Sequence, residues 1–123
     1  MAEAVEKIVI IGTHGGEDPE RASLPFVVAN AALAMDVQVT VILQGYAVTL
    51  AQKGVNGHIF AGGLAPLKEL MDNYFAQGGK ILVCTPCIKE RRITEDMLVE
   101  GATPIAAARV VQECLEAKAT LNY

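Results

Sequence analysis

Short apolar runs alternate with helix-like segments along this chain. Residues 7–11, 37–43 and 80–83 are β-branched or aliphatic runs bounded by polar and glycine residues, a pattern typical of buried strands. Residues 66–75 instead repeat their apolar side chains at helical spacing. The alternation predicts an α/β fold of the doubly wound type, with a mainly parallel sheet of about five strands and helices on both faces.

The first long helix carries a clear start signal. Asp18 followed by Pro19 predicts an N-cap and a first helical residue, and the helix is expected to continue to Ala34 or Met35. Pro25 is expected to kink this helix or to delay its true start, because proline lacks a backbone N–H.

The last third of the chain has weaker signals. Residues 94–99 fit either a short helix or a strand, and residues 101–103 read as a turn with a cap. Residues 104–117 predict a helix that begins at a proline, and residues 119–123 fit an edge strand.

The composition is that of one small, aliphatic domain covering residues 1–123. The chain is 52% hydrophobic and only 20% charged, and 5% of its residues are aromatic. A small domain has much surface for its volume, so we expect part of this apolar surface to be covered in a homo-oligomer.

Charge and cysteine content exclude several classes of protein. A formal net charge of −4 argues against nucleic-acid binding. The N-terminal segment is acidic where a signal peptide is basic, and no apolar run has the length of a membrane span, which predicts a cytoplasmic protein. Three cysteines do not make a secreted disulfide framework, so free thiols or a catalytic pair are expected.

The main chemical signal lies where the most hydrophobic strand ends, at the sequence Cys-Thr-Pro-Cys of residues 84–87. Thr85 as a cap and Pro86 as the first helical residue predict a helix whose N–H groups face the sulfurs. Lys89 and Arg91 follow within about one turn and would stabilise a thiolate. The pattern predicts pKa values below the usual value of about 8.5 for both cysteines.

Other loops are expected at the same edge of the sheet, because ligands of parallel sheets collect beyond the carboxyl ends of the strands. Thr13, His14 and Gly15 follow the first strand and Gly45 follows the second, so all four are candidate site-lining residues. His14 is a candidate proton donor or base, although a loop histidine is also simply a solvated side chain.

Several alternative interpretations of the two cysteines remain open. A structural zinc site is disfavoured because Cys114, His14 and His58 lack ligand spacing, and no metal or cofactor is predicted. The C-x-x-C spacing permits a thiol–disulfide oxidoreductase, and buried strand-end thiols without chemistry are the plainest alternative. A non-catalytic oligomeric module that binds a small ligand or a nucleotide in the first loop is another, although that loop lacks a phosphate-binding signature.

Residues 78–93, with the sequence GGKILVCTPCIKERRI, resemble the cysteine segment of the DsrE/DsrF-like sulfur-relay proteins, and specifically an uncharacterised branch with a C-x-x-C-x-x-x-R segment. Residues 18–22, 67–70 and 100–102 are also similar to that family. The resemblance implies a doubly wound subunit in a homo-trimer or homo-hexamer. It further implies a cysteine that takes sulfane sulfur from a donor protein as a persulfide and passes it to an acceptor protein.

Within this resemblance, Cys84 matches the sulfur-carrying cysteine and Cys87 a second cysteine of the uncharacterised branch. Arg91 matches the arginine that follows, whereas Arg92 stands where glycine is usual, which predicts a different turn after the short helix. The nucleophile is open between the two cysteines, with Cys84 preferred. Cys87 could then resolve the persulfide by forming a disulfide and releasing sulfide. The sequence therefore predicts a sulfur carrier more than a turnover enzyme.

Overall fold

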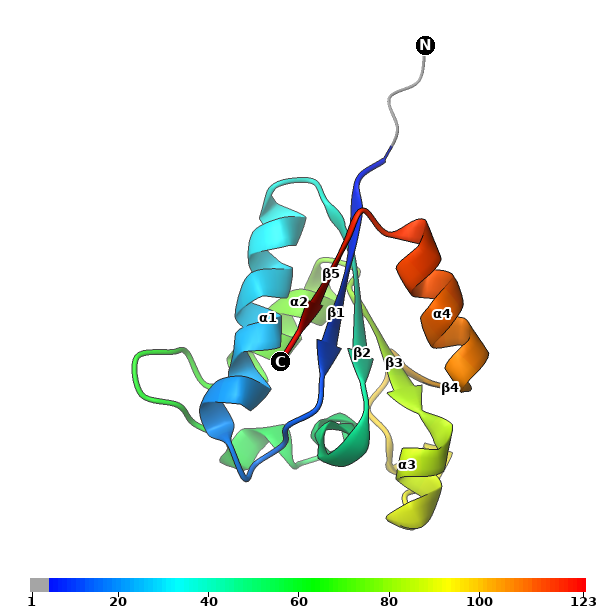
Figure 1. Ribbon diagram of the computed structural model, residues 1–123. Helices are drawn as coiled ribbons and strands as arrows, with labels where there is room; N and C mark the ends of the chain where they lie inside the picture. Colours follow the sequence, from blue (N-terminus) through cyan, green and yellow to red (C-terminus); the bar gives the residue numbers. More distant parts are fainter. Residues whose placement is uncertain (1–4) are drawn as a thin grey trace.

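The chain folds around one all-parallel sheet in the order β4-β3-β2-β1-β5, as the computed structural model shows for residues 5–123 (Figure 1). Its strands are β1 (Lys7–Gly12), β2 (Gln38–Leu43), β3 (Lys80–Cys84), β4 (Ala102–Ile105) and β5 (Ala119–Asn122). Its α-helices are α1 (Pro19–Ala34), α2 (Leu67–Ala76), α3 (Thr85–Glu90) and α4 (Ala107–Glu116). Short 3-10 helices are η1 (Gly45–Ala51), η2 (Asn56–His58) and η3 (Glu95–Met97).

The five-stranded α/β fold confirms the predicted class. Residues 1–4, part of the segment used to argue against a signal peptide, lie outside the described residues. None of the helices within residues 5–123 has the length and apolar character needed to cross a bilayer.

Helices cover the two faces of the sheet unequally. Helices α1 and α2 pack together on one face and α4 lies on the other (Figure 1). The larger core cluster lies on the α1 and α2 face and contains the fully buried side chains of Phe26 and Tyr74. The smaller cluster, beneath α4, consists of Val9, Ile42, Leu82 and Ile105. Successive strand residues therefore serve two cores, which explains why the strands read as continuous apolar runs.

Helix α1 begins where the sequence predicted. The side chain of Asp18 accepts a hydrogen bond from the backbone N–H of Arg21, and Pro19 opens the helix. The helix runs uninterrupted through Pro25, so the expected delay of its start was wrong. Pro25 is buried in the helix, where its missing N–H removes a single backbone bond.

The segment before α4 corrects a second prediction. Residues 102–105 form strand β4, not a turn, and the last helix begins at Ala107 instead of Pro104. Strand β4 pairs only with β3, so it lies at the edge of the sheet. Proline is tolerated at an edge because its missing N–H needs no partner there.

The ambiguous segment at residues 94–99 contains the 3-10 helix η3 and no strand. The predicted amphipathic helix is confirmed as α2, which buries one side-chain face against the core: Leu67, Leu70, Met71 and Tyr74. The spacing of its apolar residues was therefore sufficient to identify both the helix and its buried face.

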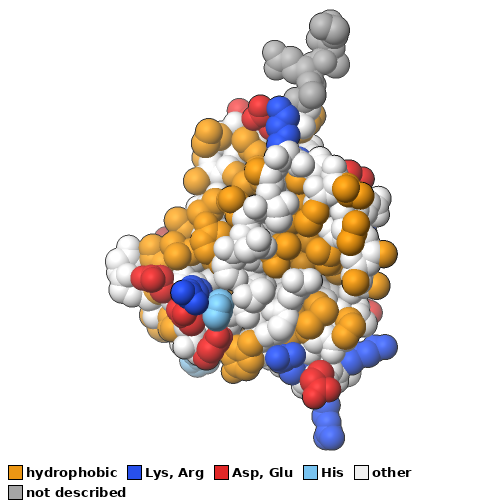
Figure 2. Space-filling view, in the orientation of Figure 1, with side chains coloured by type: hydrophobic (Ala, Val, Ile, Leu, Met, Phe, Trp, Pro, Cys, Tyr) orange, Lys and Arg blue, Asp and Glu red, His pale blue; other side chains and the backbone are white. Residues whose placement is uncertain are grey.

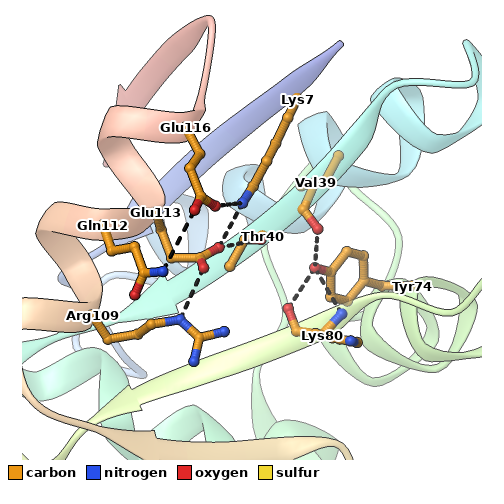
Figure 3. A network of polar contacts seen from close by, with 9 residues as sticks. All are labelled: Lys7, Val39, Thr40, Tyr74, Lys80, Arg109, Gln112, Glu113 and Glu116. Atoms are coloured by element: carbon orange, nitrogen blue, oxygen red, sulfur yellow. Dashed lines mark hydrogen bonds and ion pairs between the residues drawn. The ribbon is translucent and has the colours of Figure 1, made fainter. Parts of the chain in front are cut away.

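A polar network attaches α4 to the amino end of the sheet (Figure 3). The carboxylate of Glu113 accepts hydrogen bonds from Lys7 Nζ at 2.8 Å, Thr40 Oγ1 at 3.0 Å and Arg109 Nε at 2.9 Å. Glu113 is 6% exposed. Burial acts to raise its pKa, but the hydrogen bonds and the nearby cation outweigh burial and lower the pKa to about 2. Glu113 is therefore ionised throughout the ordinary pH range and is paired with cations from its own helix and from β1.

We predict that Glu113→Gln reduces stability at pH 7 and removes part of the acid sensitivity. A folded-state pKa of about 2 against an ordinary 4.5 stabilises the fold above pH 4.5, and this contribution is lost as the pH falls toward 2. Its size is on the order of 3 kcal/mol. Urea unfolding should show this difference between variant and wild type at pH 7 and little difference near pH 2.

Glu116→Gln is the control, because Glu116 is exposed and reaches Lys7 only at 3.4 Å. If Glu113→Gln lowered the free energy of unfolding by the same amount from pH 7 to pH 2, the lowered pKa of Glu113 would be contradicted.

Candidate functional site

The two cysteines meet at the junction of β3 and α3. The backbone of Cys84 is extended and Thr85 is the first helical residue, so Cys84 itself is the N-cap and Cys87 is the third helical residue. Side chains at these two positions face each other, as in a capping box. The Cys84 and Cys87 Sγ atoms are 2.6 Å apart. The expectation that Thr85 caps the helix was wrong, because the chain enters the helix one residue earlier.

Gly45 brings a backbone donor to this pair. Strands β2 and β3 pair in parallel with Leu43 opposite Val83, so both strands end at the same level of the sheet. The N–H of Gly45 donates a hydrogen bond to Cys87 Sγ at 3.2 Å. Gly45 has a φ of +57°, a left-handed conformation that glycine adopts readily. A donor aimed at a sulfur stabilises negative charge on it.

Electrostatics at Cys84 differ from the sequence prediction. Burial raises the pKa of the Cys84 thiol, and the hydrogen bond and charge of the Cys87 sulfur raise it further. The backbone N–H of Cys87 and the Arg91 guanidinium act in the opposite direction but do not overcome these effects. The predicted lowering of this pKa was therefore wrong for Cys84, because desolvation and a second sulfur outweigh the cation.

Arg91 and Lys89 lie differently in the site. The Arg91 guanidinium lies 5.9 Å from the ring centroid of Tyr46, and its Nη1 donates to the Cys87 carbonyl oxygen at 3.1 Å. Arg91 is thus held between the Tyr46 ring and the backbone of Cys87. Lys89 is exposed in the last turn of α3. Sequence reasoning missed Tyr46, whose only local signal is its position directly after Gly45.

The first loop lies at the same edge but makes its polar contacts elsewhere. Thr13 donates through Oγ1 to the Tyr123 carbonyl at 2.7 Å, and His14 Nδ1 lies 2.9 Å from a carboxylate oxygen of Glu17. Gly15 packs directly on η1, where an added Cβ would lie 2.7 Å from the Tyr46 ring. The structure therefore links Gly15 to the thiol site through Tyr46, whereas Thr13 and His14 are engaged with other groups.

A cavity of about 490 Å³ adjoins the thiol site on the Tyr46 side. His58 and Phe60 also line it, and Phe60 is 63% exposed. This volume is within the range of small-molecule pockets. Among residues 5–123, no group of three or more His, Cys, Asp or Glu side chains is arranged to hold a metal ion.

The turn after α3 retains the conformation of the glycine it lacks. Arg92 has a φ of +55°, and the N–H groups of Arg92 and Ile93 donate to the carbonyls of Lys89 and Ile88 at 3.0 and 2.9 Å. These bonds form a Schellman motif, which normally places glycine in the left-handed position. The expectation that Arg92 changes the turn was wrong at the level of the backbone.

Comparison with solved structures first defines the class of fold. The ychN protein from E. coli has a TM-score of 0.82 at 21% identity, covering 97% of this chain and 100% of that chain. MTH1491 from Methanobacterium thermoautotrophicum has a TM-score of 0.73 at 14% identity, covering 98% and 100%. The protein thus shares its parallel α/β fold with both.

Sequence comparison then gives the family. Residues 6–123 match the DsrE/DsrF-like family, and the chain belongs to this family. The uncharacterized protein MJ0989 of Methanocaldococcus jannaschii is 32% identical over 96 residues, 78% of this chain and 81% of that protein. The uncharacterized protein MJ0760 of the same organism is 31% identical over 97 residues, 79% of this chain. This chain spans only 35% of MJ0760.

We predict that Cys87→Ala lowers the pH at which Cys84 reacts. Removing the Cys87 sulfur removes a hydrogen bond and a charge that raise the pKa of Cys84, and it also reduces burial. The midpoint pH of iodoacetamide alkylation at Cys84, followed by peptide mass spectrometry, should therefore fall. Arg91→Gln is the opposite control, because losing the cation should raise the midpoint. An unchanged or higher midpoint in Cys87→Ala would show that the sulfurs are not coupled.

We also predict that Arg92→Gly stabilises the protein. A non-glycine residue in the left-handed region costs about 1 kcal/mol, which glycine avoids. Chemical unfolding should show a gain of up to this size, reduced by the greater freedom of glycine in the unfolded chain. Arg92→Ala keeps the backbone cost and should show no gain, so equal stabilisation by both variants would contradict this explanation.

Proposed function

We propose that the protein carries sulfane sulfur as a persulfide on the Cys84–Cys87 pair and passes it to an acceptor protein. Membership of the DsrE/DsrF-like family supports a role in sulfur relay. The observation that carries the proposal is the pair of sulfurs 2.6 Å apart at the carboxyl edge of the sheet, with the Gly45 N–H directed at one of them.

Cys87 is the better candidate for the attacking sulfur, in place of the Cys84 preferred from the sequence. Its sulfur accepts the Gly45 N–H, whereas burial and the second sulfur raise the pKa of Cys84. Burial and the neighbouring sulfur therefore favour the protonated form of Cys84, whereas the Gly45 N–H favours negative charge on the Cys87 sulfur. The Cys87 thiolate attacks the terminal sulfur of a donor R–S–SH, forming Cys87–S–SH and releasing the donor thiolate R–S⁻.

Delivery reverses this step. An acceptor thiolate attacks the outer sulfur of Cys87–S–SH, takes it as a new persulfide and leaves the Cys87 thiolate. Without an acceptor, deprotonated Cys84 attacks the inner sulfur, which forms the Cys84–Cys87 disulfide and expels HS⁻. The two sulfurs thus support loading, transfer and resolution without another cofactor.

The surface around the thiols supports a protein partner. Lys89, Arg91 and Arg92 are all exposed beside the cysteines, so an acidic surface on the donor or acceptor would complement them. Self-association is part of the proposal, because Val111 and Leu115 expose apolar side chains on α4, Leu115 to 82%. Figure 2 shows hydrophobic side chains at the surface on the side of the molecule where α4 lies. The expected homo-trimer or homo-hexamer would cover such surface.

Thiol–disulfide exchange is the second candidate function. It is favoured by the same sulfur separation of 2.6 Å, which leaves little movement before a disulfide forms. The protein products of the two functions differ in mass. A relay adds sulfur atoms to the protein, whereas thiol–disulfide exchange only removes two hydrogen atoms.

We predict that glutathione persulfide adds about 32 mass units to Cys87 in the Cys84→Ser variant and that the product persists. Wild type should load the same sulfur and then convert to the disulfide with release of sulfide. Cys87→Ser should load about tenfold more slowly, because Cys84 still has a pKa raised by burial and its sulfur lacks the Gly45 N–H donor that Cys87 has. Intact-protein and peptide mass spectrometry follow all three.

Cys114→Ser is the control and should load like wild type, and the Cys84→Ser, Cys87→Ser double variant should not load. Equal sulfur uptake by wild type and the double variant would exclude the relay site. Formation of the Cys84–Cys87 disulfide in wild type, together with no added sulfur in either single variant, would favour thiol–disulfide exchange.

A further inference from the structure

A second cavity lies at the opposite edge of the sheet, by the amino ends of β2 and β3. Its volume is about 430 Å³, within the range of small-molecule sites. Strand residues two apart share a face of the sheet, so Lys80 lies on the same face as Leu82, which packs beneath α4. Helix α4 forms the adjoining wall. The lining residues used in the argument include Gln38, Thr40, Lys80, Leu82, Arg109 and Glu113.

This cavity has an excess of positive charge. Lys7, Lys80 and Arg109 line it together with a single carboxylate, that of Glu113. That carboxylate is occupied by its three hydrogen-bond donors and is 6% exposed. Glu116 reaches Lys7 at 3.4 Å from outside the lining. After these pairings, Arg109 and Lys80 still present positive charge to the cavity.

Glu113 holds Arg109 in a defined orientation. Arg109 Nε donates to Glu113 Oε2 at 2.9 Å, and the Glu113 carboxylate is itself fixed by Lys7 and Thr40. The two terminal nitrogens of Arg109 make no hydrogen bond within residues 5–123 and extend away from Glu113 (Figure 3). A guanidinium held by one edge offers its other N–H groups as a planar fork, which fits a carboxylate in bidentate fashion.

Further groups suit an organic anion. The Lys80 ammonium is without a side-chain partner in the described part of the chain, where only the backbone of Lys80 is bonded, to Tyr74. Gln38 adds an amide that can donate, while Leu33 and Leu82 supply apolar wall. A carboxylate on a short hydrocarbon chain satisfies both the cations and the apolar surface.

We propose that this cavity is a binding site for a small organic carboxylate, held by the Arg109 fork and the Lys80 ammonium. The site is separate from the thiols, which lie at the carboxyl edge of the same sheet. The binding proposal does not depend on sulfur relay. Its test can fail or succeed without bearing on the thiol chemistry.

The test is an NMR titration of the ¹⁵N-labelled protein with sodium succinate at low ionic strength. Succinate should shift the backbone amides of Gln38, Thr40, Gly78 and Lys80 and leave those of Gly45 and Cys87 in place. Succinamide, the neutral isostere, should bind at least about tenfold more weakly. Inorganic sulfate should also bind more weakly than succinate, because it lacks the hydrocarbon part.

Two variants test the residues. Lys80→Gln and Arg109→Gln should each weaken succinate binding about tenfold. Lys80 is exposed and outside the Glu113 network, so Lys80→Gln keeps the test valid if Arg109→Gln loosens α4. Lys68→Gln is the matched control, because Lys68 is an exposed lysine on α2 that pairs with Asp72.

Four results would overturn the proposal: succinamide binding as tightly as succinate, sulfate binding as tightly as succinate, unchanged affinity in Lys80→Gln, or shifts located away from the cavity. Persulfide loading at the cysteines, measured in the same Lys80→Gln protein, should equal that of wild type. A loss of persulfide loading in this variant would concern the thiol site and would leave the succinate result to be judged by the binding measurements alone.

Discussion

Parallel pairing of β2 with β3 sets the geometry on which the thiol site depends. With Leu43 opposite Val83, the two strands end together, and the amide of Gly45 reaches the first turn of α3. A shift of one residue in this register would turn each buried side chain to the other face, so two separate cores hold the register in place. The position of the donor near Cys87 is therefore fixed by backbone pairing and core packing, and not by mobile side chains.

The helix that follows β3 sets the relation between the sulfurs. As N-cap and third helical residue, Cys84 and Cys87 face each other because of the helical backbone itself. Their closeness affects the reactivity of Cys84, whereas a separate contact acts on Cys87. The closeness raises the pKa of one thiol, which keeps that thiol protonated, while the Gly45 donor favours charge on the other. The asymmetry between two identical side chains thus comes from burial and one backbone N–H.

Much of the fold could be predicted from sequence because its signals are local. The apolar runs, the Asp18–Pro19 start of α1 and the face of α2 all depend on residues close together in the chain. Strand β4 was missed because it forms only where β3 offers a free edge. The thiols and Gly45 were placed correctly at one edge by topology. The predicted lowering of the Cys84 pKa was wrong, because that pKa depends on desolvation.

The hydrogen-bond network of Glu113 shows the limit of prediction from the sequence more clearly. Lys7 and Glu113 lie 106 positions apart, so no window of sequence places a cation beside this helical glutamate. In isolation, Glu113 reads as an ordinary surface residue of an amphipathic helix. The fold instead buries it and uses it to hold α4 on a face where residues 5–123 place no other α-helix (Figure 1).

Sulfur placed on Cys87 under the proposed relay would have a short residence time. The Cys84 sulfur stands within bonding reach, so each loaded molecule partitions between handover and futile leakage of sulfide. The high proton affinity of Cys84 slows the leakage near neutral pH and ceases to do so in alkaline conditions. The surrounding pH would therefore set the time within which an acceptor protein must bind to receive the persulfide sulfur.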